Sequence, residues 1–71
     1  MDIEKLIEAY KSKKCVTLYY NNNYVATINF KHNTYCEIGK YTIYVYVKKT
    51  KQYGFLGLRL IVNFDTFVIN N

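Results

Sequence analysis

The chain has 71 residues, a net charge of +5, a hydrophobic fraction of 51% and no proline. This length predicts one domain near the lower limit for independent folding, and the composition excludes a disordered chain. No apolar run is long enough to span a bilayer, and no secretory signal follows Met1. We therefore expect a protein of the cytoplasm, or of the host-cell cytoplasm if a phage encodes it. Two cysteines predict reduced thiols rather than a disulfide scaffold, and a Cys15–Cys36 bridge would require their strands to pair closely.

The positive charge is unevenly distributed. Three of the five acids lie within the first eight residues, whereas from Tyr10 onward nine lysines and arginines face two acids, a net charge of +7. Such a basic body favours a polyanionic or acidic partner. Coding bias is an alternative explanation for much of this character, since A/T-rich codons encode the abundant Lys, Asn, Tyr, Ile and Phe.

A helix is predicted over about residues 2–13. Ile3, Leu6, Ile7 and Tyr10 follow the i, i+3, i+4, i+7 spacing of an amphipathic helix. Asp2 can serve as the N-cap, and acids at the start with lysines at the end complement the helix dipole. The apolar stripe is expected to cover one face of a sheet.

After residue 14 the hydrophobic period changes from 3.6 to 2, which predicts strands. The expected strands cover about residues 15–20, 24–30, 35–38, 41–49, 55–62 and 64–69. The asparagines at 21–23 predict a tight hairpin loop, because asparagine tolerates positive φ. Gly39 and Lys40 predict either a turn or a β-bulge.

The predicted fold is a single α+β domain over residues 1–71. One N-terminal amphipathic helix packs on one face of a five- or six-stranded antiparallel sheet. Strand alternation then predicts the core residues: Val16, Leu18, Ala26, Ile28, Ile43, Val45, Val47, Leu56, Leu58, Leu60 and Val62, facing Ile3, Leu6, Ile7 and Tyr10.

The sequence offers no arrangement typical of an enzyme. His32 lies in a predicted turn without an orienting partner, and Cys36 would lie roughly 13 Å away along a strand. Gly54 to Gly57 lack the spacing and the lysine of a phosphate-binding loop. We expect no catalytic residues, no metal site and no cofactor.

The face opposite the predicted core combines tyrosines with cations. Its expected partner-binding residues are Tyr19, Tyr44, Tyr46, Lys48, Lys49, Lys51, Tyr53 and Arg59. Such a face can stack on bases while cations contact phosphates, or it can form an aromatic docking region for an acidic protein. A third interpretation is structural, in which cross-strand tyrosines simply cover the open side of a thin sheet.

Residues 1–14, running directly into short strands rich in Tyr and Asn, resemble the start of small phage-encoded inhibitors such as the anti-CRISPR proteins of low-GC bacterial phages. The resemblance implies a non-enzymatic inhibitor of a host nucleic-acid-processing or defence complex, with a host protein or ribonucleoprotein as partner. The best-known Cas9-blocking members are acidic mimics of DNA. This basic chain departs from them, so the resemblance implies contact with guide RNA or an acidic surface.

Two other functions compete with this interpretation. The chain can bind RNA or single-stranded DNA directly, in which case affinity falls steeply with salt. It can also be a structural subunit that self-associates as a homodimer through a sheet edge or the tyrosine face. The acidic start of the helix disfavours simple duplex binding.

Overall fold

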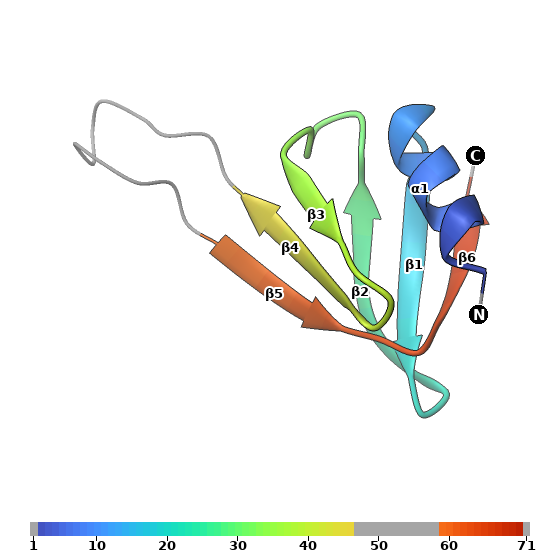
Figure 1. The fold of residues 1–71 in the computed structure, drawn as a ribbon. Helices are drawn as coiled ribbons and strands as arrows, with labels where there is room; N and C mark the ends of the chain where they lie inside the picture. Colours follow the sequence, from blue (N-terminus) through green and yellow to red (C-terminus); the bar gives the residue numbers. More distant parts are fainter. Residues whose placement is uncertain (1, 47–58, 71) are drawn as a thin grey trace.

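The computed structural model describes residues 2–46 and 59–70. Within these residues one helix precedes six strands (Figure 1). In chain order the elements are α1 (Ile3–Lys11), β1 (Cys15–Tyr20), β2 (Asn23–Asn29), β3 (Cys36–Ile38), β4 (Thr42–Tyr46), β5 (Arg59–Asn63) and β6 (Thr66–Asn70). The described ends of the helix and strands lie within two residues of the expected positions. The expected strand residues 47–49 and 55–58 lie outside the described part.

Both ends of α1 are capped. The Asp2 side chain accepts a hydrogen bond of 3.1 Å from the Glu4 N–H, which confirms the predicted N-cap. At the other end the Lys14 N–H donates to the Ala9 carbonyl and the Lys13 N–H donates to the Tyr10 carbonyl. This pair of bonds is a Schellman motif, and Lys13, with φ +57°, occupies the position that usually carries glycine.

The first sheet has the strand order β2-β1-β6, and both pairings are antiparallel. Asn21 and Asn22 have φ of +51° and +63°, so the loop between β1 and β2 is a two-residue turn of the type that matches strand twist. The predicted asparagine hairpin is thereby confirmed. The β1–β2 register slips after Leu18, which leaves Val25 as an extra residue in β2.

The second sheet has the order β3-β4-β5 and is also antiparallel. The Gly39 N–H donates to the Thr42 carbonyl at 2.8 Å, so Gly39 and Lys40 belong to a turn between β3 and β4 rather than to a bulge. A Cβ atom at Gly39 would lie 3.1 Å from the Thr42 carbonyl oxygen, which explains why glycine suits this position. In β4–β5 the paired residues include Tyr46 with Arg59.

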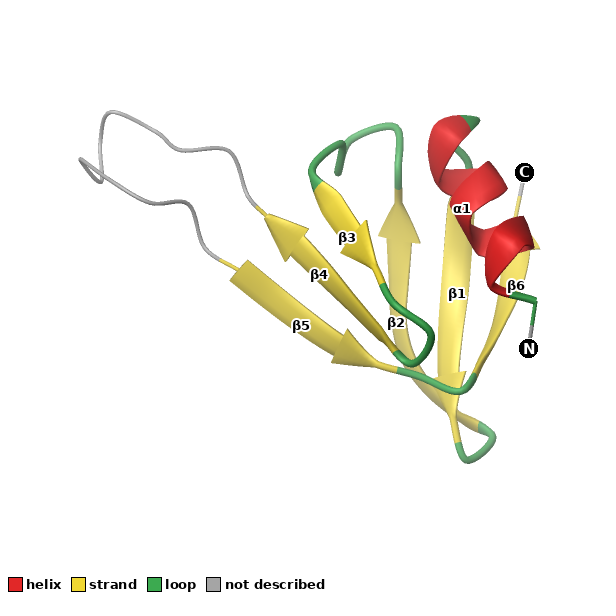
Figure 2. Cartoon of the chain, in the orientation of Figure 1, coloured by secondary structure: helices red, strands yellow, loops and turns green. Residues whose placement is uncertain are grey.

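The prediction of one five- or six-stranded sheet is wrong, whereas the α+β class is confirmed. The chain forms two three-stranded antiparallel sheets, and α1 lies over β1 and β6 of the first (Figure 2). Phe64 and Asp65 carry the chain from β5 in the second sheet to β6 beside β1. Alternation identifies the inner side of each strand but not its neighbours, so it could not distinguish one sheet from two.

The two sheets and the helix share one buried cluster. It consists of Leu6, Ala9, Val16, Leu18, Ile28, Phe30, Ile43, Val45, Val62 and Phe64. Seven of these residues were predicted as core, and Ile3, Tyr10 and Ala26 pack against the cluster half-buried. Val47, Leu56 and Leu58 lie outside the described residues.

The core prediction failed at a few positions for identifiable reasons. Ala9, Phe30 and Phe64 were missed: Ala9 is a small residue beside the helical stripe, Phe30 continues the alternation of Ala26 and Ile28 by one more step, and Phe64 lies between β5 and β6. Leu60 was predicted as buried but is 54% exposed. It lies on the same side of β5 as the buried Val62, at a point where the described part of the chain does not cover it.

Candidate binding groove

The structure divides the predicted tyrosine and cation face between two sheets. Tyr44 and Tyr46 lie on the outer side of β4, and Tyr46 is paired with Arg59 of β5. Tyr19 belongs to β1 of the other sheet, where its partners are Tyr24 and Thr66. The three predicted tyrosines are half-buried.

Four of the predicted partner-binding residues cannot be placed. Lys48, Lys49, Lys51 and Tyr53 lie outside the described residues. The predicted face therefore reduces to a small group around Tyr46 and Arg59, with Tyr19 on a separate surface. Its role in partner binding stays a prediction.

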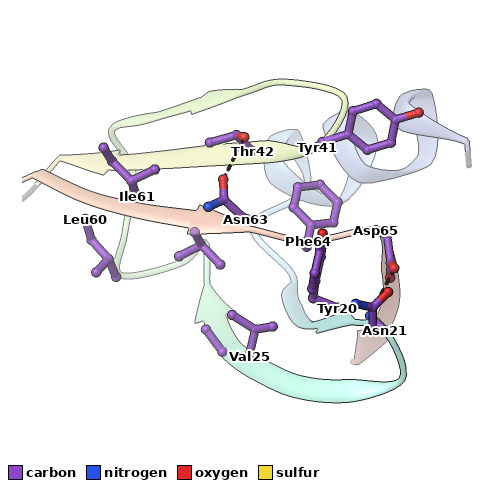
Figure 3. Close-up of a pocket in the computed structure, with 12 residues that line it drawn as sticks. Tyr20, Asn21, Val25, Tyr41, Thr42, Leu60, Ile61, Asn63, Phe64 and Asp65 are labelled. Carbon is purple, nitrogen blue, oxygen red and sulfur yellow. Dashed lines mark hydrogen bonds between the residues drawn. The ribbon is translucent and has the colours of Figure 1, made fainter.

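A different feature, an open groove of about 1040 Å³, lies between β5 and the start of β2 (Figure 3). We call it the β2–β5 groove. The residues that line it include Tyr20, Val25, Tyr41, Leu60, Ile61 and Phe64. Leu60 and Ile61 lie on opposite sides of β5, and Val25 lies on the Leu60 side. The groove thus joins the edge of one sheet to the edge of the other.

Large apolar side chains are unusually exposed around this groove. Tyr41 is 57% exposed, Leu60 54%, Tyr20 50%, Ile61 47% and Val25 39%. All five line the same groove, Ile61 from one side of β5 and Leu60 and Val25 from the other, whereas single exposed apolar residues need no explanation. An apolar patch of this kind is typical of a surface that another molecule covers.

The polar groups near the groove lie at the end close to β6. Asp65 accepts a hydrogen bond of 3.0 Å from the Asn21 N–H, which ties the β1–β2 turn to the chain between β5 and β6. The Thr42 hydroxyl donates to the Asn63 side-chain carbonyl at 3.1 Å (Figure 3). The Lys40 ammonium lies 5.4 Å from the centre of the Tyr41 ring.

The backbone of β5 offers hydrogen-bonding groups toward the groove. The Phe64 N–H donates to the Tyr41 carbonyl at 2.9 Å, which marks positions 41 and 64 as a hydrogen-bonded pair. Antiparallel pairs alternate, so Leu60 and Val62 continue the bonds to β4. The N–H and carbonyl groups of Ile61 and Asn63 therefore point away from β4, to the open side of the strand.

The described residues carry no cluster suited to metal binding. Within residues 2–46 and 59–70, no group of three His, Cys, Asp or Glu side chains is placed to hold a metal ion. His32 is an exposed turn residue. The Cys36 thiol donates to the Asn33 carbonyl, and burial raises its pKa, which disfavours the reactive thiolate.

Sequence reasoning missed the groove because its residues come from strand edges and turns. Tyr20 is the last residue of β1 and Tyr41 precedes β4, so each lies at a turn, where alternation along the strand does not show whether a residue is covered. One signal was present in the sequence: Leu60, Ile61 and Val62 are consecutive apolar residues, which breaks the alternation expected when one side of a strand faces water.

The described chain contains no helix of the length and apolar character needed to span a membrane. Comparisons with protein-family models, with curated proteins and with solved structures found no match for this chain.

Proposed function

We propose that this chain is a non-enzymatic binding protein that docks a partner protein in the β2–β5 groove. The observation that carries the proposal is the cluster of exposed apolar side chains, of which Leu60 and Ile61 are 54% and 47% exposed. A chain with so small a core gains more by burying such residues than by leaving them in water, so a groove lined by several exposed apolar residues favours an interface.

The groove suits binding better than the predicted tyrosine face does. Tyr19, Tyr44 and Tyr46 are each half-buried, whereas Tyr20 and Tyr41 at the groove are half-exposed or more. Aromatic residues of this kind are frequent energetic anchors of protein interfaces. The groove therefore replaces the tyrosine face as the main docking surface in this proposal.

The biological role we propose is that of a phage or mobile-element inhibitor acting on a host nucleic-acid-processing or defence complex. This part of the proposal has the sequence resemblance to small phage inhibitors as its support, together with the net charge of +5. An inhibitor of this type works by stoichiometric occupancy, which requires a surface but no catalytic group.

A pull-down from host lysate, with and without nuclease, tests the proposal. The wild type is compared with Leu60→Asp/Ile61→Asp and with the control Val68→Asp, because Val68 is 52% exposed on β6, outside the residues that line the groove. We expect one host protein or complex to survive nuclease and to be lost in the double variant alone. Equal capture by all three proteins would contradict docking in the groove.

Single-stranded nucleic acid binding is a second candidate, favoured by the pairing of Tyr46 with Arg59 on β4 and β5. Aromatic rings can stack on bases while the cations of a basic chain contact phosphates. The test is titration of an oligonucleotide at several salt concentrations with wild type and Tyr46→Ala/Arg59→Ala. This candidate requires a steep salt dependence that weakens in the variant.

A further inference from the structure

The side of the first sheet that faces away from the core is built from uncharged residues. Val16 and Leu18 of β1 point into the buried cluster that the sheet shares with α1 and the second sheet. The residues that alternate with them in β1, and their partners in β2 and β6, therefore form the opposite side. We call this side the outer face; its residues are Cys15, Thr17, Tyr19, Tyr24, Thr27, Asn29, Thr66, Val68 and Asn70. Charged residues make up 21% of the chain, yet none of these nine is Lys, Arg, Asp or Glu.

Four residues of the outer face form a hydrogen-bonded row across all three strands. The Asn70 side-chain amide of β6 donates to the Thr17 hydroxyl of β1 at 2.7 Å. The Thr17 hydroxyl lies 3.4 Å from the Thr27 hydroxyl of β2, which in turn lies 3.1 Å from the Tyr24 hydroxyl. The 3.4 Å distance is long for a pair of hydroxyls, so both threonines can turn a proton toward a ligand at little cost. The row is thus a set of prepositioned donors and acceptors.

The Tyr24 ring lies along the outer face beside this row. Three residues of a strand span roughly 10 Å, so the Tyr24 hydroxyl reaches Thr27 only if the ring lies along β2. A ring in that position has one side toward the sheet and the other toward water. Tyr24 is 64% exposed, the largest exposed fraction among the large apolar side chains of the described chain. The ring therefore offers a flat apolar platform.

We infer that the outer face binds a neutral oligosaccharide, a function separate from docking in the β2–β5 groove. Sugar rings pack their C–H groups on aromatic rings, because the face of such a ring carries negative charge density. Sugar hydroxyls are donors and acceptors at once, as are the hydroxyls of Thr17 and Thr27. A flat face suits an extended, ribbon-like saccharide, so the ligand is a β-1,4-linked chain rather than a coiled α-1,4-linked one.

Two other occupants fit the outer face less well. A nucleic acid needs cations against its phosphates, and the nine residues of the outer face supply none. A second copy of this chain needs about 800 Å² of interface from each partner. Strands about 4.8 Å apart and residues about 3.4 Å apart give this three-stranded sheet a face of only roughly 300 Å². That area accommodates a few sugar rings but is small for a protein interface.

Titration with neutral tetrasaccharides, followed by amide chemical shifts, tests the inference. The probes are cellotetraose and its N-acetylated analogue chitotetraose, which share the β-1,4 linkage. Maltotetraose, the α-1,4-linked isomer of cellotetraose, is the matched control. We expect the better probe to bind with a Kd of about 0.1–5 mM, at least about fivefold more tightly than maltotetraose, with the largest shifts in the outer face. Because neither the ligand nor the outer face is charged, Kd should change by less than about twofold between 50 and 500 mM salt.

Variants of the outer face separate the platform from the hydroxyl row. Tyr24→Ala removes the platform and should weaken binding at least about tenfold. Thr27→Val keeps the side-chain shape but removes the hydroxyl shared by Tyr24 and Thr17, so it should weaken binding about three- to tenfold. The control Tyr35→Ala removes a tyrosine that is 59% exposed outside the outer face, and it should bind as the wild type does. Should Tyr24→Ala fail to fold, Thr27→Val gives the comparison.

The outcomes separate this inference from the proposed function. No binding of either probe at 10 mM, or equal binding of the probes and maltotetraose, overturns the inference. Equal binding by Thr27→Val, Tyr35→Ala and the wild type also overturns it. Val68 is paired with Thr17, so Val68→Asp adds a charge to the outer face and should weaken the saccharide more than Leu60→Asp/Ile61→Asp does. The pull-down requires the reverse order for the host partner, so either proposal can fail without the other.

Discussion

The part of the molecule beneath α1 and the part beside the β2–β5 groove each carry a leucine that points inward from its strand, yet the two leucines differ in burial. Leu18 of β1 is fully buried in the cluster that includes Leu6 and Ala9 of α1, whereas Leu60 of β5 is 54% exposed. Alternation gives both leucines an inward direction. The comparison shows that direction is a property of the strand, while burial depends on whether another element lies opposite.

The largest expected effect comes from truncating the two leucines. Leu18→Ala should lower the free energy of unfolding by about 2–5 kcal/mol, because it leaves a cavity in the shared core. Leu60→Ala should cost under about 1 kcal/mol, because its side chain already contacts water. Urea unfolding measures both. A loss at Leu60 as large as that at Leu18 would mean that the groove is closed in solution.

The sequence predicted each strand well and the assembly of strands poorly. The α1 cap, the asparagine turn and the inward direction of Val16, Ile43 and Val62 all follow from local chemistry. Strand neighbours depend instead on contacts between distant segments, such as the pairing of β1 with β6. No local pattern encodes that pairing, so the second sheet was not foreseen.

The candidate site was missed for the same reason. The predicted surface treated Tyr19 and Tyr46 as neighbours, although they lie in different sheets. The groove arises where two sheet edges meet, so it exists only once the two-sheet arrangement is known. The local sign was that β5 carries apolar residues on both sides, Leu60 and Ile61, and so has no polar side for water.

The next largest effect on stability is expected at Tyr10, which holds α1 against the core. The Tyr10 hydroxyl donates to the Thr34 carbonyl at 2.6 Å, and its ring packs edge-on against Phe30 at 5.2 Å. Tyr10→Phe keeps the ring contact and removes the hydrogen bond, so it should cost about 1 kcal/mol in urea unfolding. The control Tyr24→Phe removes an exposed hydroxyl that contacts Thr27 and should cost less. Equal costs would contradict a special role for Tyr10.

A smaller effect of opposite sign is expected at the end of α1. Lys13 has φ +57° in a Schellman motif, a conformation that favours glycine. Lys13→Gly should therefore raise stability by up to about 1 kcal/mol. Lys11→Gly, inside the last helical turn, should lower it by about 0.5–1 kcal/mol. Thermal unfolding checks both signs, and destabilisation by Lys13→Gly would show that the lysine side chain makes a contact that outweighs the backbone strain.

The smallest expected effect is a pH dependence of stability, which reports how well the second sheet is covered at β3, away from the groove. Cys36 of β3 packs against the shared core, and burial raises the pKa of its thiol. The unfolded thiol therefore ionises first as pH rises. The stability that the protonated Cys36 thiol contributes is fully present below about pH 8.5 and is lost as pH rises toward the pKa of the folded protein.

Cys36→Ala removes this titration but leaves the exposed lysines and tyrosines unchanged. The difference in free energy of unfolding between wild type and Cys36→Ala should thus be constant from pH 6.5 to 8 and should shrink toward pH 10, by less than about 1.4 kcal/mol per pH unit. Urea unfolding at each pH measures it. A constant difference across the whole pH range would mean that β3 is as open to water as the groove at β5. The contrast between covered and open regions would then lie between the two sheets rather than within the second sheet.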